Sequence, residues 1–147
     1  MSDFFDSLDV SASALSAERM RMNVTSSNLA NAQTTRTPEG GPYRRKDVVF
    51  EATPTRDFAS VLASQLGESP LHHVQVTDVI SDPNAPRMVH DPNHPDANEE
   101  GMVAYPNVNT MEEMVNLMNA SRTYEANVTA INVAKGMMGK ALEIGRK

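Results

Sequence analysis

The sequence predicts a mainly α-helical protein in which long N- and C-terminal helices form a coiled-coil pair and a small β-rich region lies between them. All nine prolines fall between positions 38 and 106, and both proline-free ends carry apolar residues at heptad spacing. Short apolar runs in the middle are bounded by turn-forming residues. Because proline cannot continue a helix, the chain divides into residues 1–36, 37–109 and 110–147, and the first and last of these are predicted to be helical assembly domains.

The N-terminal segment carries one apolar row at heptad spacing, which is typical of a coiled-coil seam. The row consists of Leu8, Leu15, Met22 and Leu29. Residues 23–28 are rich in Asn, Ser and Thr, whose side chains compete with the backbone for hydrogen bonds and lower helix stability. We therefore expect this helix to be marginal alone and to be stabilised by packing partners.

The C-terminal segment repeats the pattern with a main row and a companion row. The main row is Leu117, Tyr124, Ile131 and Met138, and the companion row contains Met114, Val128 and Leu142. Asn109 or Thr110 is a suitable helix cap, and the acidic residues Glu112 and Glu113 suit the positive end of the helix dipole. At about 1.5 Å per residue the two helices would extend roughly 45 to 55 Å, so their seams are expected to face each other and neighbouring chains.

The middle region contains four predicted strands, each rich in β-branched or aromatic residues and bounded by Pro, Asn or Gly. In chain order they span residues 47–51, 74–80, 87–89 and 102–105. Apolar residues between positions 55 and 67 recur at helical spacing instead, which predicts one short helix there. We therefore expect a small β-rich unit with a single short helix.

Charge and composition exclude several classes of function. The formal net charge of −6 leaves no basic surface for nucleic acid, and we interpret the one basic cluster, Arg44 to Lys46, as a solvated turn or as local ion-pair partners. The absence of cysteine excludes disulfides, thiolate nucleophiles and zinc–thiolate sites. Residues 1–10 do not resemble a secretory signal, and no apolar run reaches the roughly 20 residues of a membrane helix. Any export route should therefore need no cleaved signal.

Candidates for catalysis or metal binding are few. His90 and His94 are four positions apart, but the prolines around them oppose the helix that would place both on one face. A turn held by Asp, Asn and Pro is the favoured interpretation. His72 and His73 begin a predicted strand and should point to opposite faces. We find no phosphate loop or nucleophile elbow in the sequence and expect no catalytic site, metal or cofactor.

The terminal segments also carry motifs of a known family. Residues 8–19, followed by the motif Asn28-Leu29-Ala30-Asn31, resemble the N-terminal signature of flagellar rod, hook and hook-associated axial proteins. Further segments are similar to the proximal-rod members of that family, namely residues 40–50, 94–97, 103–109, 113–116 and 120–128.

This resemblance implies a non-enzymatic structural subunit of the periplasmic rod in the flagellar basal body. Such a subunit would assemble helically with copies of itself and with other rod proteins, meet the basal-body ring proteins, and transmit motor torque for motility. The resemblance also implies export through the flagellar type III apparatus. The residues expected at the assembly interface are Leu8, Leu15, Met22, Asn28, Leu29, Ala30, Asn31, Met114, Leu117, Tyr124, Val128, Ile131, Met138 and Leu142.

Two alternatives stay open at this point. A coiled-coil adaptor or chaperone of the flagellar secretion system would be a folded oligomer of fixed size. A distal-rod or hook subunit would have a larger middle domain than this chain has.

Overall fold

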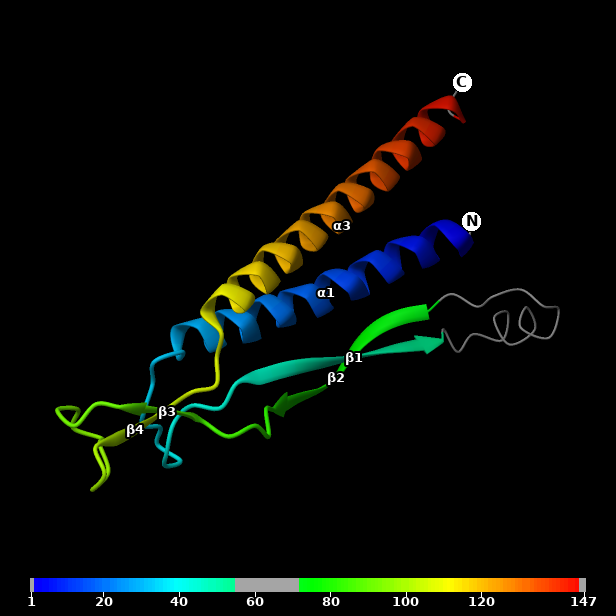
Figure 1. Cartoon of the computed structure of the whole chain (residues 1–147). Helices are drawn as coiled ribbons and strands as arrows, with labels where there is room; N and C mark the ends of the chain where they lie inside the picture. Colours follow the sequence, from blue (N-terminus) through cyan, green and yellow to red (C-terminus); the bar gives the residue numbers. More distant parts are fainter. Residues whose placement is uncertain (1, 55–71, 146–147) are drawn as a thin grey trace. The chain divides into compact units, whose positions relative to one another are not determined.

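The computed structural model describes residues 2–54 and 72–145 (Figure 1). Its elements, in chain order, are α1 (Ser2–Ala30), β1 (Lys46–Pro54), β2 (His72–Ser81), β3 (Arg87–His90), β4 (Met102–Tyr105) and α3 (Thr110–Ile144). The 29 residues of α1 and the 35 of α3 make up a little under half of the 147-residue chain. The two long terminal helices and the four predicted strands are confirmed. The pairing of the helices as a coiled coil stays a prediction, and the short helix predicted within residues 55–67 lies outside the described residues.

The chain divides into two compact units. The first comprises Met1–Met20, Phe50–Thr77 and Ala120–Lys147, and the second comprises Arg21–Val49 and Asp78–Asn119. Each long helix therefore contributes one part of its length to each unit. No helix among the described residues is both long and apolar enough to cross a membrane.

In the first unit, small residues of α1 allow close approach of β2, which pairs with β1 in a two-stranded sheet. The hydroxyl of Ser13 accepts a hydrogen bond from the backbone N–H of Val74 at 3.2 Å, and Ala17 is only 4% exposed. His73 is half-buried and its Nε2 lies 3.9 Å from a carboxylate oxygen of Asp9, whereas His72 is exposed. The two adjacent histidines therefore lie in different surroundings, as their position at the start of a strand predicts.

In the second unit, β3 and β4 form an antiparallel pair. Its register joins Arg87 to Tyr105, Met88 to Ala104, Val89 to Val103 and His90 to Met102. Val103 has no exposed surface, so this small sheet contributes to the buried interior of the unit.

The connection from β3 to β4 is a turn-rich loop, as the sequence predicts. The backbone N–H of Asp91 donates to the carbonyl of Gly101 at 2.9 Å, and the side-chain oxygen of Asn98 accepts the N–H of Met102 at 2.8 Å. Gly101 has a φ of +73° and a Cβ there would lie 3.1 Å from the ring of His90, so glycine is required for both conformation and space. His90 and His94 therefore belong to a strand end and a loop, not to one helix face.

The N-terminus of α3 is capped by Asn109, one of the two residues predicted for this role. Its side-chain oxygen accepts the N–H groups of Met111 at 3.1 Å and Glu112 at 3.5 Å. Its carbonyl accepts the N–H of Glu113 at 3.0 Å. These bonds satisfy backbone donors that have no partner within the helix.

We predict that replacing Asn109 with Ala lowers the free energy of unfolding by about 1 kcal/mol, because the capping acceptor is lost. Asn109→Asp keeps an acceptor and adds a negative charge at the positive end of the helix dipole, so it should be neutral or slightly stabilising. Urea unfolding followed by far-UV circular dichroism measures both variants. An equal loss of stability in the two variants would show that the cap does not stabilise α3.

Candidate functional site

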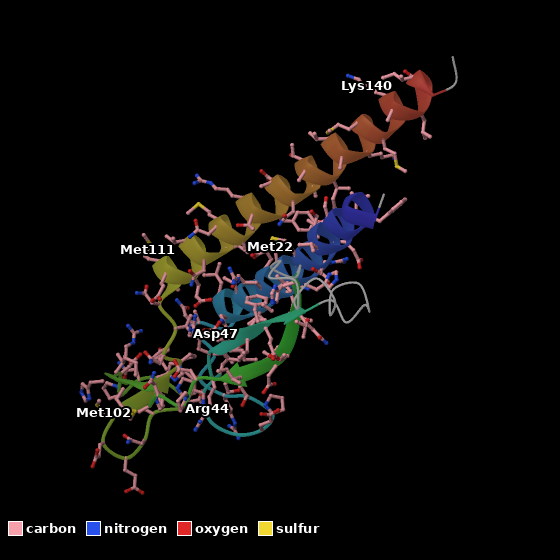
Figure 2. The ribbon with its side chains drawn as sticks, turned by 90° about the vertical axis from the view of Figure 1, so that its right-hand side faces the viewer. Met22, Arg44, Asp47, Met102, Met111 and Lys140 are labelled. Carbon is pink, nitrogen blue, oxygen red and sulfur yellow. The ribbon has the colours of Figure 1, made fainter. Side chains whose placement is uncertain are left out.

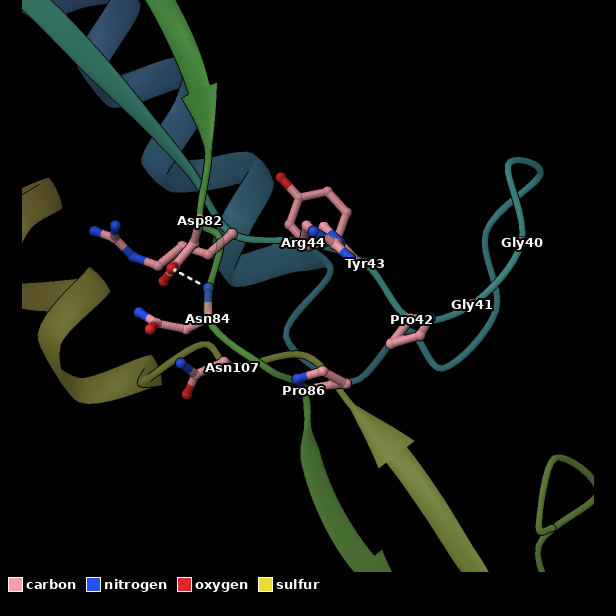
Figure 3. Close-up of a pocket in the computed structure, with 10 residues that line it drawn as sticks. Gly40, Gly41, Pro42, Tyr43, Arg44, Asp82, Asn84, Pro86 and Asn107 are labelled. Atoms are coloured by element: carbon pink, nitrogen blue, oxygen red, sulfur yellow. Dashed lines mark hydrogen bonds between the residues drawn. The ribbon is translucent and has the colours of Figure 1, made fainter.

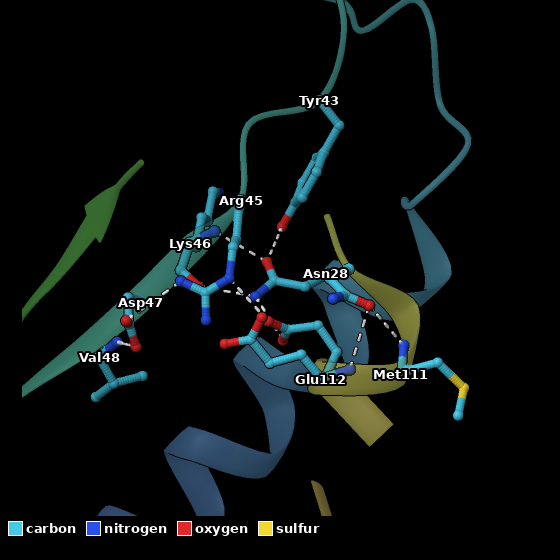
Figure 4. A network of polar contacts seen from close by, with 10 residues as sticks. Asn28, Tyr43, Arg45, Lys46, Asp47, Val48, Met111 and Glu112 are labelled. Carbon is cyan, nitrogen blue, oxygen red and sulfur yellow. Dashed lines mark hydrogen bonds and ion pairs between the residues drawn. The ribbon is translucent and has the colours of Figure 1, made fainter. Parts of the chain in front are cut away.

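Asn28, near the C-terminal end of α1, lies at the centre of a polar network in the second unit (Figure 4). Only 1% of its surface is exposed. Its side-chain nitrogen donates to the carbonyl of Lys46 at 2.8 Å and to a carboxylate oxygen of Glu113 at 3.0 Å. Its side-chain oxygen accepts the N–H of Lys46 at 2.9 Å and the hydroxyl of Tyr43 at 3.0 Å. A side-chain amide offers two donors and two acceptor sites, and all of them are used.

The two bonds to Lys46 involve its backbone, so the Asn28 amide takes the place of a neighbouring strand at the first residue of β1. An amide can do this because it carries a donor and an acceptor side by side, as a peptide group does. Asn28 therefore determines where β1 begins relative to the end of α1 within this unit.

Glu113, in the first turns of α3, completes the network. It is only 1% exposed, and its second carboxylate oxygen accepts from Nε of Arg45 at 2.8 Å. A buried carboxylate is tolerated only when its charge and its hydrogen-bonding capacity are both matched. Arg45 supplies the opposite charge and Asn28 supplies the second donor, so the network joins α1, the start of β1 and α3.

Arg45 also contacts Asp47 on the surface, with 3.3 Å between Nη1 and the carboxylate. Burial by itself would lower the pKa of the Arg45 guanidinium, but hydrogen bonding and charge from Glu113, with help from Asp47, raise that pKa above its ordinary value. The guanidinium therefore stays charged at any pH at which proteins normally fold. The interpretation of the Arg44 to Lys46 cluster as local ion-pair partners is confirmed for Arg45 by its contact with Asp47. It missed the second partner of Arg45, because Glu113 lies 68 residues away in the sequence.

The rest of the Asn28-Leu29-Ala30-Asn31 motif ends the helix. The side-chain nitrogen of Asn31 donates to the carbonyl of Ser27 at 2.9 Å, and its side-chain oxygen accepts the hydroxyl of Thr34 at 3.2 Å. α1 ends at Ala30, six residues before the end of the N-terminal segment predicted for residues 1–36. The motif thus combines a buried network residue with a helix stop.

A glycine-containing turn brings Tyr43 to the network. Gly40 and Gly41 have φ values of +90° and +77°, which other residues adopt only with strain. The N–H of Tyr43 donates to the carbonyl of Thr34 at 3.0 Å, so the loop returns to the segment that follows α1. The tyrosine hydroxyl is thereby held within reach of Asn28 (Figure 4).

The same loop lines a small cavity of about 160 Å³ (Figure 3). Its wall also contains Asp82, whose N–H donates to the carbonyl of Arg45 at 2.7 Å and whose carboxylate accepts the N–H of Asn84 at 2.9 Å. The first bond connects the residue after β2 to the residue before β1, and the second holds the turn that follows β2, so both contacts have a structural role. In the part of the chain that the structure describes, no group of three or more His, Cys, Asp or Glu residues could hold a metal ion.

The predicted helix rows differ in exposure. All members of the α1 row and of the main α3 row are half-buried, namely Leu8, Leu15, Met22, Leu29, Leu117, Tyr124, Ile131 and Met138. No single contact described above joins the two rows, so their mutual packing stays a prediction.

The other interface candidates divide into covered and uncovered residues. Val128 and Asn31 are half-buried and Ala30 is exposed. Met114 and Leu142 are 44% and 66% exposed, so they do not complete the covered face of α3. The covered face of α3 instead includes the positions that lie one residue before those of the companion row. These positions are Glu113, Ala120, Asn127 and Ala134. Apolar pattern alone missed this row because its members are small or polar.

The opposite side of α3 carries uncovered apolar side chains. Met111 is 70% exposed, Met118 is 54% exposed and Met137 is 66% exposed. Figure 2 shows Met111 projecting from the first turn of the helix. Exposed apolar side chains that recur along a helix indicate a surface that can meet a partner.

The network residues Arg45, Tyr43 and Glu113 were not predicted as interface residues from the sequence. Glu113 was assigned only to the helix dipole, and nothing local pairs it with a residue in another segment. The one feature of the sequence that pointed to the network was Asn28 itself, as the first residue of the motif at positions 28–31.

Comparisons with known proteins match both ends of the chain. The family described as flagella basal body rod protein matches residues 8–36, and the family described as flagellar basal body rod FlgEFG protein C-terminal matches residues 99–144. The first matched segment contains Asn28 and the second contains Glu113, so each matched segment of this chain holds one partner of the buried network.

Whole-chain relatives give the same result. The chain is 50% identical to the flagellar basal-body rod protein FlgC of Bacillus subtilis, over 97% of this chain and 98% of the relative. It is 39% identical to FlgC of Borreliella burgdorferi, over 95% and 96% of the two chains. It is 41% identical to FlgC of Escherichia coli, over 94% and 95%. This chain therefore belongs to the flagellar basal-body rod protein family.

Proposed function

We propose that this chain is a structural subunit of the bacterial flagellar rod, which assembles through α1 and α3 with copies of itself and with other rod proteins. The observation that carries this proposal is the near full-length similarity to proteins named as flagellar basal-body rod proteins. The two matched family segments correspond to the two terminal helices and their flanks. In this proposal the chain is non-enzymatic and its assembled form carries motor torque.

The likeness of residues 40–50, 94–97 and 103–109 to proximal-rod members supports a place in the proximal, periplasmic part of the rod. There the chain would meet other rod proteins and the basal-body rings. We also propose that it leaves the cytoplasm through the flagellar type III apparatus without a cleaved signal. An export adaptor or chaperone is less favoured, because the relatives that match nearly the whole chain are named as rod proteins.

The exposure pattern of α3 supports assembly through the helices. One face is half-buried within the chain, while the opposite face keeps Met111, Met118 and Met137 more than half exposed. A helix with apolar side chains on two faces is stable in water only when both are covered. Neighbouring subunits can cover the outer face, and methionine adapts its shape to partners that are not identical.

The same pattern couples folding to assembly. α1 holds buried Thr25 and Asn28 in a polar run that lowers its intrinsic helix stability. Any partner that binds only the folded helices raises their stability by mass action. Separate subunits should therefore have weakly protected helix ends, and assembled subunits should not.

The assignment to the rod predicts that deleting the gene from its source bacterium abolishes motility and leaves basal bodies without complete rods. A tagged copy of the chain should restore both properties and be recovered in purified basal bodies. Electron microscopy and motility assays provide the measurement. Complete rods in the deletion strain would contradict the proposal.

The seams predict strong assembly defects for Leu29→Asp and Ile131→Asp. Full burial of either side chain contributes roughly 1.5 to 3 kcal/mol per subunit, and a charge excluded from water costs several kcal/mol more without a partner. Basal-body yield in cells measures the effect, and amide exchange of β3 and β4 in purified variants checks the fold.

The matched control is Ser26→Asp on α1, which places the same charge on an exposed position of the helix that carries Leu29. Exposed substitutions usually change stability by about 0.5 kcal/mol or less, so this control should build rods. Equal rod yields from seam and control variants would disprove the role of the seams.

The network predicts that Asn28→Asp lowers the free energy of unfolding by on the order of 3 kcal/mol. The variant loses the hydrogen bonds donated to Lys46 and Glu113, and it places a second carboxylate next to that of Glu113. Adding Glu113→Gln should recover about 1 kcal/mol or more, because it removes the repulsion and supplies a donor. Asn23→Asp makes the same chemical change at an exposed position of α1 and should be nearly neutral. Denaturant unfolding of the native chain, Asn28→Asp, Glu113→Gln and the double variant gives the coupling energy. Similar losses from Asn28→Asp and Asn23→Asp would contradict the network.

A further inference from the structure

Among the described residues, five side chains accept the backbone N–H of the residue two positions later. The acceptors are Asp82, Asp91, His94, Asn98 and Asn109, which hold the N–H groups of Asn84, Asn93, Asp96, Glu100 and Met111 at 2.9, 3.3, 3.1, 3.0 and 3.1 Å. Four of these acceptors are carboxylate or amide oxygens. His94 alone uses a ring nitrogen, Nδ1.

This difference matters because the acceptors respond differently to pH. An amide oxygen does not titrate, and a carboxylate takes up a proton only well below neutral pH. An imidazole nitrogen accepts a hydrogen bond only while it is unprotonated, and imidazoles commonly change charge between about pH 5 and 8. Of the five backbone N–H groups, that of Asp96 is therefore the one whose acceptor is an imidazole nitrogen, which a proton can occupy.

The residue that His94 holds in place connects two segments of the second unit. One carboxylate oxygen of Asp96 accepts the hydroxyl of Thr35 at 2.8 Å. Thr35 belongs to the segment that follows α1, and Asp96 belongs to the loop between β3 and β4. Because the His94 bond orients the backbone of Asp96, it also orients the carboxylate that reaches Thr35.

The surroundings of His94 can accept a proton without general unfolding. Its ring lies edge-on to Tyr105 of β4, with 6.1 Å between ring centroids. The backbone N–H of His94 donates to the carbonyl of Asp91 at 3.3 Å. Asp91 and Asp96 of the loop attract an imidazolium, as do the exposed Glu99 and Glu100 in the same loop.

Two basic groups oppose that attraction. Arg87 of β3 lies 6.0 Å from the centroid of the Tyr105 ring, and His90 ends the same strand. A protonated His94 ring would be attracted by the loop carboxylates and repelled by the basic residues of β3. Protonation of His94 can therefore change contacts within the loop without breaking the β3–β4 pair.

We propose that His94 is a pH-sensitive latch for the contact between the β3–β4 loop and the segment after α1. With neutral His94, Nδ1 holds the Asp96 N–H and the Asp96 carboxylate holds Thr35. On protonation, Nδ1 carries a hydrogen and faces the Asp96 N–H as a second donor, so this bond is lost and the carboxylate turns toward the imidazolium. The Thr35 contact is then released. This inference does not depend on the proposed function.

The test is amide exchange of the purified full chain by NMR at about pH 7.5 and about pH 5, corrected for intrinsic exchange rates. Protection of the Asp96 amide should fall by about tenfold at the lower pH, which is the loss expected for one hydrogen bond. The amides of Glu100 and Asn84, held by Asn98 and Asp82, provide controls in the same molecule and should stay constant. Equal losses at all three amides would indicate general loosening and would overturn the latch.

His94→Asn is the matched variant, because asparagine makes the same bond elsewhere in this loop without titrating. Asp96 protection in this variant should not change between the two pH values, and neither should the backbone resonance of Thr35. In the native chain the Thr35 resonance should shift between the two pH values, and Thr35→Val should remove the contact with Asp96 that causes this response. The proposal is wrong if Asp96 protection in the native chain is independent of pH, or if His94→Asn shows the same pH dependence.

Discussion

The buried amide of Asn28 is the constraint on which the second unit depends. Its four hydrogen bonds bring together residues from the end of α1, the loop before β1, the first residue of β1 and the first turns of α3. None of these segments is held to the others by a large apolar core, since the fully buried side chains include Glu113 and Asn28 alongside Val103 and Pro106. Where so little apolar surface is buried, geometry is specified by polar groups that have no other place to bond.

This arrangement explains why an axial protein can have little core of its own. Hydrogen bonds and a buried ion pair add less net stability than apolar burial does, but they penalise every alternative arrangement that leaves one group unpaired. The network therefore specifies how strand and helices meet in this unit. On α3, the side chains of Met111, Met118 and Met137 stay more than half exposed.

The sequence predicted the fold well and the site only in part. Prolines confined to the middle separated the helices from the strands, and the cap at Asn109 and the strand at residues 102–105 were placed correctly, because each depends on local geometry. The network was not predicted, since Arg45 and Glu113 become neighbours only through tertiary structure. A further covered row of α3, which includes Ala120 and Ala134, was also not predicted, for a related reason. Ala120 is buried and Ala134 is half-buried, because small side chains allow close approach, and an apolar heptad does not reveal this.

The junction between β4 and α3 has a mechanical consequence. Only residues 106–109 separate the strand from the helix, beginning with buried Pro106 and ending with Asn109, whose side chain is bound to the helix. Proline has one backbone torsion angle fixed by its ring, and the cap immobilises the residue at the other end. Few backbone bonds of residues 106–109 are left free to rotate. A rotation of the beginning of α3 is therefore transmitted to the small sheet. Within this unit, the sheet and the first turns of the helix are therefore joined by a short connection that resists rotation.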